Sequence, residues 1–268
     1  MWKIDEGASY PYLPQFAVMV SEITLDKVEA ELQRGSSLQL VATVMPEDAR
    51  NKTVKWTSGD DKIATVDAGG VVSAIAIGST TITATAADGS GVTAACKVTV
   101  TPKLVTSITL SNEELTLERL ATAQLTATAL PEDADNRKVE WNSGNPEVAT
   151  VSEEGLVTAT GIGSTTITAT AADGSETVAT CKVTVTPKLV KSITLSDEEL
   201  TIERTYTKQI TATALPEDAD NREVEWSSDK TAVATVDENG LVTAVGTGTA
   251  TITVTAADGS GVTASCIV

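Results

Sequence analysis

The chain has 268 residues, with 19 Lys and Arg against 37 Asp and Glu, a formal net charge of −18 and no histidine. The missing histidine excludes histidine-based catalysis and histidine metal sites. The acidic balance excludes nucleic acid as a partner, because nucleic acids attract clustered Lys and Arg. Apolar residues make up 41% and aromatic residues 3%, so the core must consist of small aliphatic side chains, which favours strands.

Residues 1–17 differ in composition from the rest of the chain. They hold four of the eight aromatic residues, together with Pro11 and Pro14. This predicts an extended segment, the tail of a preceding module, and a tail docked on the first module is the alternative. The segment lacks the basic start and apolar stretch of a signal peptide. No part of the chain reaches 18 consecutive apolar residues, which predicts no membrane insertion.

The remaining sequence consists of three copies of one unit, which align without gaps. Members of each matched set lie 85 residues apart: Trp56, Trp141 and Trp226; Cys96, Cys181 and Cys266; Gly78, Gly163 and Gly248. A unit of this length is the size of a small independent domain. We therefore expect domains at 18–102, 103–187 and 188–268, with the last one truncated at its last strand, because Val268 matches Val98.

Apolar and polar residues alternate within each unit, which is typical of strands with one buried face. The alternation runs through Leu38 to Val44, Ile82 to Ala86 and Ala94 to Val100. About seven such strands per unit, separated by turn signals, predict an antiparallel two-sheet sandwich. No segment has a helical period, so we expect almost no helix. The pair Asp88-Gly89 and its two counterparts predict type I′ hairpin turns.

Each unit has one tryptophan and one cysteine. We interpret the tryptophan as a core residue, since it fills space that alanine and valine cannot; an exposed tryptophan that stacks on carbohydrate is the alternative. One cysteine per unit cannot close a disulfide within the unit, and the spacing offers no zinc motif. The three cysteines are therefore expected to be buried thiols.

Four motifs recur in every unit: V-x-W-x-S, I/V-A-T-V-x-x-x-G-x-V-x-A, G-x-x-x-I-T-x-T-A-x-D-G and a closing A-x-C-x-V. In this combination the chain resembles the bacterial immunoglobulin-like group 2 family over nearly all of residues 18–268. The resemblance implies an all-β fold of three tandem Ig-like antiparallel β-sandwiches, which we expect to form an extended rod. It also implies a secreted or cell-surface bacterial protein, often an adhesin, with no shared catalytic residues.

No enzymatic activity is expected, and the sequence assigns no catalytic, cofactor-binding or metal site. A serine or cysteine nucleophile would lack a histidine base, and no phosphate loop occurs. The strongest candidate site is an acidic loop, which offers the closely spaced carboxylates that calcium prefers. Its alternative interpretation is a solvated turn. The loop occurs three times, at 46–50, 131–135 and 216–220.

The sequence therefore favours a stalk or spacer of tandem domains in a bacterial cell-surface protein. Two alternatives stay open: direct binding of a host protein or glycan, and an accessory region of a secreted carbohydrate-active enzyme. The partner would be a host or cell-surface protein or glycan, the location extracellular or on the bacterial surface, and the chain a monomer. The near-identity of the repeats favours spacing over recognition.

Overall fold

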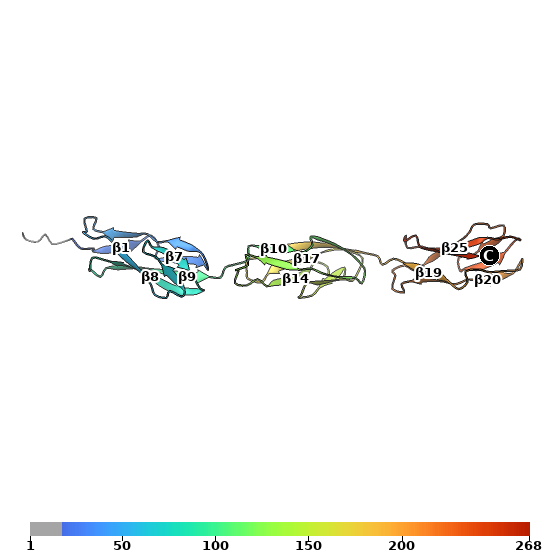
Figure 1. Cartoon of the computed structure of the whole chain (residues 1–268), viewed down its shortest axis with the longest axis horizontal. Coiled ribbons are helices and arrows are strands. Elements are labelled where there is room, and N and C mark those ends of the chain that lie inside the picture. Colours follow the sequence, from blue (N-terminus) through green and yellow to red (C-terminus); the bar gives the residue numbers. More distant parts are fainter. Residues whose placement is uncertain (1–17) are drawn as a thin grey trace, which may run out of the picture. The chain divides into compact units, whose positions relative to one another are not determined.

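The computed structural model describes residues 18–268 (Figure 1), which contain 26 strands and no helix. The prediction for residues 1–17 lies outside the described residues. The absence of helix in the described part follows from the alternation of apolar and polar residues, which buries one face of a strand but cannot bury one face of a helix. The all-β prediction is therefore confirmed.

The chain divides into two compact units. The first consists of the residues up to Thr106, together with Leu130–Arg137 and Asp173–Ser175. The second consists of the remaining residues. The strands of the first repeat thus lie in the first unit, and those of the third repeat lie in the second unit.

The first repeat forms a sandwich of three small sheets, with strand orders β2-β9-β8-β5, β3-β7-β6 and β1-β4. Most strands are short, whereas β8 and β9 have nine residues each and form the longest hairpin. The strands are β1 (Glu22–Leu25), β2 (Glu29–Gln33), β3 (Ser37–Gln39), β4 (Ala42–Met45), β5 (Val54–Ser58), β6 (Ala64–Val66), β7 (Val71–Ala74), β8 (Gly78–Ala86) and β9 (Thr93–Thr101).

The second repeat has the same strand orders, β11-β18-β17-β14, β12-β16-β15 and β10-β13. Its strands match those of the first repeat in position and length. They are β10 (Ser107–Leu110), β11 (Glu114–Glu118), β12 (Thr122–Gln124), β13 (Ala127–Leu130), β14 (Val139–Ser143), β15 (Ala149–Val151), β16 (Leu156–Ala159), β17 (Gly163–Ala171) and β18 (Val178–Thr186).

The third repeat has eight strands, in the orders β22-β25-β26, β20-β24-β23 and β19-β21. It lacks a counterpart of β2 and β11. Its strands are β19 (Ser192–Leu195), β20 (Thr207–Gln209), β21 (Ala212–Leu215), β22 (Val224–Ser228), β23 (Ala234–Val236), β24 (Leu241–Ala244), β25 (Thr251–Ala256) and β26 (Thr263–Ile267).

The sequence predicts about seven strands per unit, whereas the first two repeats have nine. One predicted strand is divided in two, and the prediction missed a further strand, β2 in the first repeat and β11 in the second. The strand expected over Leu38 to Val44 breaks at Leu40, whose N–H donates to the Gly70 carbonyl at 2.9 Å. On either side of the break, β3 and β4 join different sheets. The pairs of β2 with β9 and of β11 with β18 are parallel.

The core agrees with the predicted alternation. Ile82 and Ala84 of β8 and Cys96 and Val98 of β9 are fully buried, whereas Lys97 between the last two is exposed. The equivalent positions of the other two repeats are buried as well, except Val268, which is partly buried. All three cysteines are buried free thiols, as predicted. The tryptophans, one each on β5, β14 and β22, are half-buried and pack against the core.

The prediction of type I′ turns at the Asp-Gly pairs is wrong. Such a turn needs positive φ at both central residues, but only Gly89 has it, at 87°, and six residues separate β8 from β9. Asp88 instead accepts the N–H of Ser90 at 2.9 Å and the N–H of Val20 at 2.5 Å. Its carboxylate therefore ties the start of the repeat to this loop. Asp173 and Asp258 hold Val105 and Val190 in the same way.

Candidate functional sites

The described residues offer little chemistry of the kind that enzymes use. They contain no cluster of three or more Cys, Asp or Glu side chains that could hold a metal ion. The three thiols are buried, and burial raises their pKa above the ordinary value, so they are protonated at neutral pH. The part of the chain that the structure describes also has no helix that could cross a membrane.

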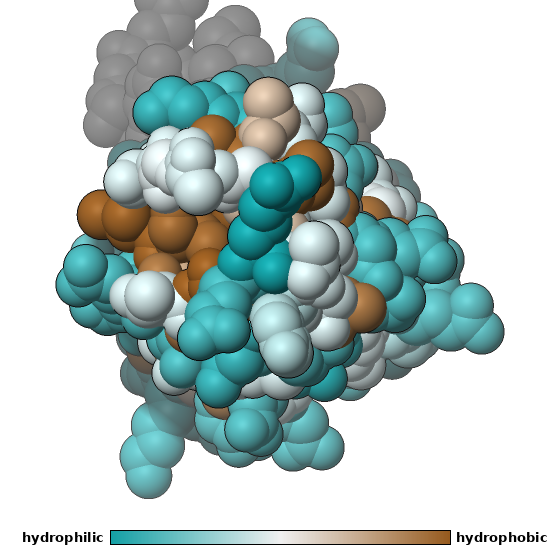
Figure 2. All heavy atoms as spheres, turned by 90° about the vertical axis from the view of Figure 1, so that its right-hand side faces the viewer, coloured by the Kyte–Doolittle hydropathy of each residue, from teal (hydrophilic) through white to brown (hydrophobic). Residues whose placement is uncertain are grey.

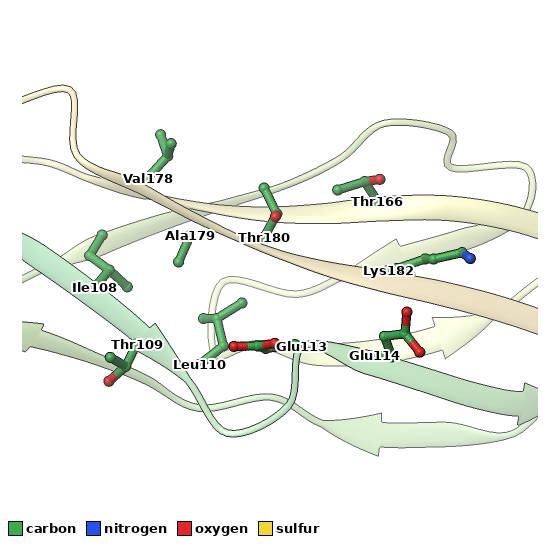
Figure 3. A pocket seen from close by; sticks show the side chains of 10 residues that line it. All are labelled: Ile108, Thr109, Leu110, Glu113, Glu114, Thr166, Val178, Ala179, Thr180 and Lys182. Atoms are coloured by element: carbon green, nitrogen blue, oxygen red, sulfur yellow. The ribbon is translucent and has the colours of Figure 1, made fainter.

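A shallow groove of about 600 Å³ lies on the second sandwich, between β10, the start of β11, and β18. Figure 3 shows Glu114 and Lys182 side by side at one end and Ile108 and Val178 at the other. Its lining includes no aromatic side chain that could stack on a sugar and no nucleophile paired with a base. The groove therefore lacks the features of a carbohydrate or catalytic site.

The acidic loop of the second repeat binds cationic groups of the protein itself. In the first compact unit, Arg34 Nε donates to Asp135 Oδ1 at 2.8 Å and to Oδ2 at 3.0 Å, while Arg34 Nη2 donates to the Asp133 carbonyl. The backbone N–H of Lys103 donates to Asp135 Oδ2 at 2.7 Å, and Lys103 Nζ pairs with Asp133 at 2.8 Å. The Arg34 and Asp135 side chains are 29% and 25% exposed, so water screens this pair less than a surface ion pair.

The same arrangement occurs in the second compact unit, 85 residues further along the chain. Arg119 Nε pairs with Asp220, and Arg119 Nη2 donates to the Asp218 carbonyl at 3.3 Å. The N–H of Lys188 donates to Asp220 Oδ2 and Lys188 Nζ to Asp218 Oδ2, both at 2.6 Å. Because it forms twice, the contact is a property of the repeat sequence.

The first repeat has the same loop backbone but carries the opposite charge at the end of the loop. Arg50 stands where the other two repeats have aspartate, and Val18 stands where they have lysine. The Arg50 N–H still donates to the Val18 carbonyl at 3.0 Å, as the aspartate N–H groups do to their lysine carbonyls at 2.9 Å. This loop therefore presents a cation where the others present a carboxylate.

These contacts act on the acidity of the loop carboxyls. The backbone N–H of Lys103, and then Arg34, hold the pKa of Asp135 below its ordinary value of 3.8. Hydrogen bonds from Lys103 and Lys188 lower the pKa of Asp133 and Asp218. A carboxyl with a lowered folded-state pKa stabilises the fold above its ordinary pKa and loses this contribution as pH falls through the folded value. The contact of Asp135 with Arg34 therefore persists at neutral pH and weakens in acid.

The sequence pointed to these acidic loops but not to the arginines that bind them, because the partners are 101 residues apart. A signal was present nonetheless. The arginine recurs at the same position in all three repeats, whereas the loop residue is arginine in the first repeat and aspartate in the other two. A change of charge at one position of otherwise matched loops indicates that this position has a charged neighbour.

The third sandwich has an open groove where the first two have a buried valine. Val100 and Val185 are 1% and 2% exposed and lie opposite a leucine in the parallel pairs. In the third repeat, the corresponding segment makes a single bridge, between Glu199 and Ile267. The groove has a volume of about 210 Å³ and is lined in part by Leu200, Ile202, Val233 and Val268. Figure 2 shows apolar side chains gathered in a hollow on this end of the sandwich.

Extending the chain by Thr-Val-Thr after Val268 is expected to raise the unfolding temperature of the third sandwich. The added valine would take the position of Val100 and Val185, and burying one such side chain contributes roughly 1.5–3 kcal/mol. Calorimetry of the full chain measures the effect, with a Thr-Asp-Thr extension as the matched control. Equal transition temperatures for the two extensions would show that the groove does not accept the valine.

Together, the fold and these sites define a chain of Ig-like β-sandwiches without a clustered catalytic or metal-binding set among the described residues. Residues 19–98, 104–183 and 189–267 match the family "Bacterial Ig-like domain (group 2)". The chain therefore belongs to this family, whose domains are non-catalytic modules, and carries three tandem copies.

Curated relatives come from different kinds of protein. Ice-binding protein 1 of Shewanella frigidimarina is 34% identical over 234 residues, 83% of this chain and 26% of the relative. An Ig-like virion protein of Serratia phage KSP90 is 35% identical over 173 residues, 63% of this chain and 66% of the relative. An uncharacterized protein of Clostridium acetobutylicum is 35% identical, over 72% of this chain and 20% of the relative. The chain thus spans less than two thirds of the length of each.

Solved structures with similar folds also consist of tandem domains. Domains 1–6 of surface layer protein SbsC align with 93% of this chain and 40% of that chain, at 20% identity and a TM-score of 0.33. Mouse cadherin-23 EC22–24 aligns with 92% of this chain and 97% of its own length, at 13% identity and a TM-score of 0.35. At these scores the alignments carry no further argument.

Proposed function

We propose that the chain is a spacer, a stalk of tandem Ig-like domains that holds another part of a bacterial cell-surface protein away from its attachment. The repeated arginine–aspartate contact is the observation that supports this best. It forms between Arg34 and Asp135 in one unit and between Arg119 and Asp220 in the other. A spacer must resist bending where its domains join, and an ion pair beside a short Thr-Pro-Lys connection limits that bending.

Recognition of a host protein or glycan is less well supported. Binding surfaces concentrate aromatic and arginine side chains in one buried centre, whereas the groove on the second sandwich has neither. An accessory role in a secreted carbohydrate-active enzyme remains a second candidate. A 72-residue stretch of the chain is 44% identical to 3-O-alpha-D-galactosyl-alpha-L-arabinofuranosidase of Bifidobacterium longum subsp. longum, covering 6% of that enzyme. In such an enzyme, too, the repeats would act as a spacer between other domains.

Small-angle X-ray scattering of the full chain at pH 7 tests the spacer proposal. Three sandwiches in line predict a maximum dimension of roughly 110 Å, from strands of about eight residues rising ~3.3 Å each plus loops. A compact particle would contradict the proposal. Saturable binding of the chain to a glycan array would favour recognition instead.

The contribution of the arginines is tested by comparing Arg34→Ala/Arg119→Ala with the control Arg137→Ala/Arg222→Ala. The first pair removes both arginine contacts, so its scattering should indicate a wider range of conformations. The control should scatter like the unmodified chain. Identical scattering for both double variants would show that the arginine contacts do not restrain the domains.

A further inference from the structure

The third repeat carries the same arginine as the other two, in a different setting. Arg204 lies 85 residues after Arg119, is exposed, and its Nε donates to the Val245 carbonyl at 3.3 Å. No carboxylate of the described residues forms an ion pair with it. The other two arginines each have such a carboxylate, so Arg204 has the donors of a contact that forms twice elsewhere in the chain.

We propose that the surface around Arg204 is a docking site for an Ig-like domain whose acidic loop ends in aspartate. The two formed contacts define what the partner must present. It must offer an aspartate carboxylate to Arg204 Nε and the carbonyl of the residue two positions earlier to Nη2. The loop sequence Pro-Glu-Asp-Ala-Asp satisfies both requirements in the second and third repeats.

The start of the partner domain takes part in the same arrangement. In both formed contacts, the N–H of the lysine in the Pro-Lys connection binds the second oxygen of the aspartate, and the lysine Nζ binds the other loop aspartate. The lysine thus holds the carboxylate in place before the arginine reaches it, which is the kind of preorganisation that strengthens a polar contact. A partner domain should therefore begin with Pro-Lys.

A second ion pair adds a further requirement for the partner domain. Glu118 pairs with Lys191 at 3.3 Å in the second unit, whereas the first repeat has Gln33 in place of Glu118. The third repeat has an acid at this position, Glu203. Its partner should consequently carry a lysine at the position of Lys191, as the third repeat itself does. Both members of this pair are well exposed, so it contributes to selectivity more than to affinity.

The surface around Arg204 also includes a tyrosine that the other two repeats lack at this position. Tyr206 is 64% exposed and stands where the first two repeats have Ser36 and Ala121. It borders a shallow depression of about 370 Å³ that also includes Leu200 and Ile202. Tyrosine beside arginine is a common combination at protein interfaces, because its ring buries apolar area while its hydroxyl stays hydrated.

This chain's own first domain is excluded as the partner. Its loop ends in Arg50, so a head-to-tail contact between two copies of the chain would bring two guanidinium groups together. Like charges that face each other across an interface disfavour the wrong partner as strongly as opposite charges favour the right one. The charge at one loop position therefore determines which domains can follow the Arg204 surface and which cannot.

The test extends the full chain by a second copy of residues 184–268, joined after Val268, because Val268 corresponds to Val183. The appended domain then presents a copy of Asp220 to Arg204. Spin labels at Glu225→Cys in the third domain and at the same position of the appended copy report the distance between the domains by double electron–electron resonance. The native cysteines are fully buried and free, so they do not compete for the label.

Four chains are compared: the unmodified extension, Arg204→Ala, Asp220→Arg in the appended copy, and the charge swap Arg204→Asp with that same Asp220→Arg. The unmodified chain should give a narrow distance distribution, and each single variant one about twofold broader, because the charge-assisted contact is lost. The charge swap should restore the narrow width, which a misfolded domain could not do. Equal widths in all four chains would overturn the proposal. This outcome is independent of the maximum dimension that tests the spacer role.

Discussion

Replacing Gly155 by alanine is expected to destabilise the second sandwich far more than replacing Gly174 by alanine. Both glycines have positive φ, 83° and 82°, so alanine costs about 1 kcal/mol in backbone strain at either position. The space around them differs. A Cβ at Gly155 would lie 2.5 Å from the Leu125 carbonyl oxygen and 3.0 Å from Trp141 Cζ2, whereas a Cβ at Gly174 meets nothing within 4 Å.

The neighbours of Gly155 cannot easily move away. The Leu125 N–H donates to the Gly155 carbonyl at 2.9 Å, so the two backbones are held together at the break between β12 and β13. Leu125 is itself fully buried. Forcing a methyl group into such a contact costs roughly 1–3 kcal/mol beyond the strain. The total for Gly155→Ala is therefore about 2–4 kcal/mol.

Denaturant unfolding of the full chain, followed by calorimetry, measures both variants. Gly70 and Gly240 have the same contacts in the other repeats, so moving the substitution should move the weakened transition from one sandwich to another. Gly89→Ala and Gly259→Ala serve as controls, because both positions have positive φ and open space. If Gly155→Ala and Gly174→Ala lower stability equally, the close contact does not determine the effect.

The strands and the core could be predicted because they depend on local patterns. Alternating residues such as Ile82, Ala84, Cys96 and Val98 give the same face of a strand whatever the strand pairs with, and all four are buried. The repeat strengthened this prediction, since the same pattern in three aligned copies cannot arise from chance. Features that depend on contacts with distant backbone could not be predicted in this way.

The missed features all involve partners far apart in sequence. The strand break at Leu40 depends on the carbonyl of Gly70, and the parallel pair of β2 with β9 joins the two ends of the repeat. The predicted type I′ turn at Asp88 does not form, and the Asp88 carboxylate accepts the N–H of the distant Val20 in addition to that of the neighbouring Ser90. A dipeptide preference describes an isolated hairpin and carries no information on such a bond.

The acidic loops could be predicted from local sequence, but the side chains that bind them could not, because those side chains are distant in sequence. Closely spaced carboxylates identified the acidic loops, and calcium was the hypothesis weighed against a solvated turn. The structure adds a third possibility, since Asp133 and Asp135 bind Lys103 and Arg34. Charge alone could not distinguish a loop that binds a metal cation from a loop that binds the cationic side chain of a residue 101 positions earlier.

Replacing Trp56 by alanine is expected to destabilise the first sandwich by about 3 kcal/mol, the lower end of the range for a large aromatic residue, because the ring is only half-buried. Trp56 packs against two groups of buried residues, one around Leu40 and Val72 and the other around Ala84 and Ala86. Leu25 packs against both groups as well, but a leucine cannot fill the space of an indole ring. The loss of Trp56 would therefore leave a cavity that small neighbours cannot refill.

Trp56→Phe is the matched comparison, since phenylalanine keeps an aromatic ring in the same place and should recover more than half of the lost stability. Urea unfolding of the full chain gives the midpoints, and an unchanged slope confirms that stability and not the unfolded state has changed. The alternative role, stacking on carbohydrate, makes the opposite prediction. Trp56→Ala would then abolish glycan binding while leaving the free energy of unfolding unaltered, because a ring that serves a ligand contributes little to the core.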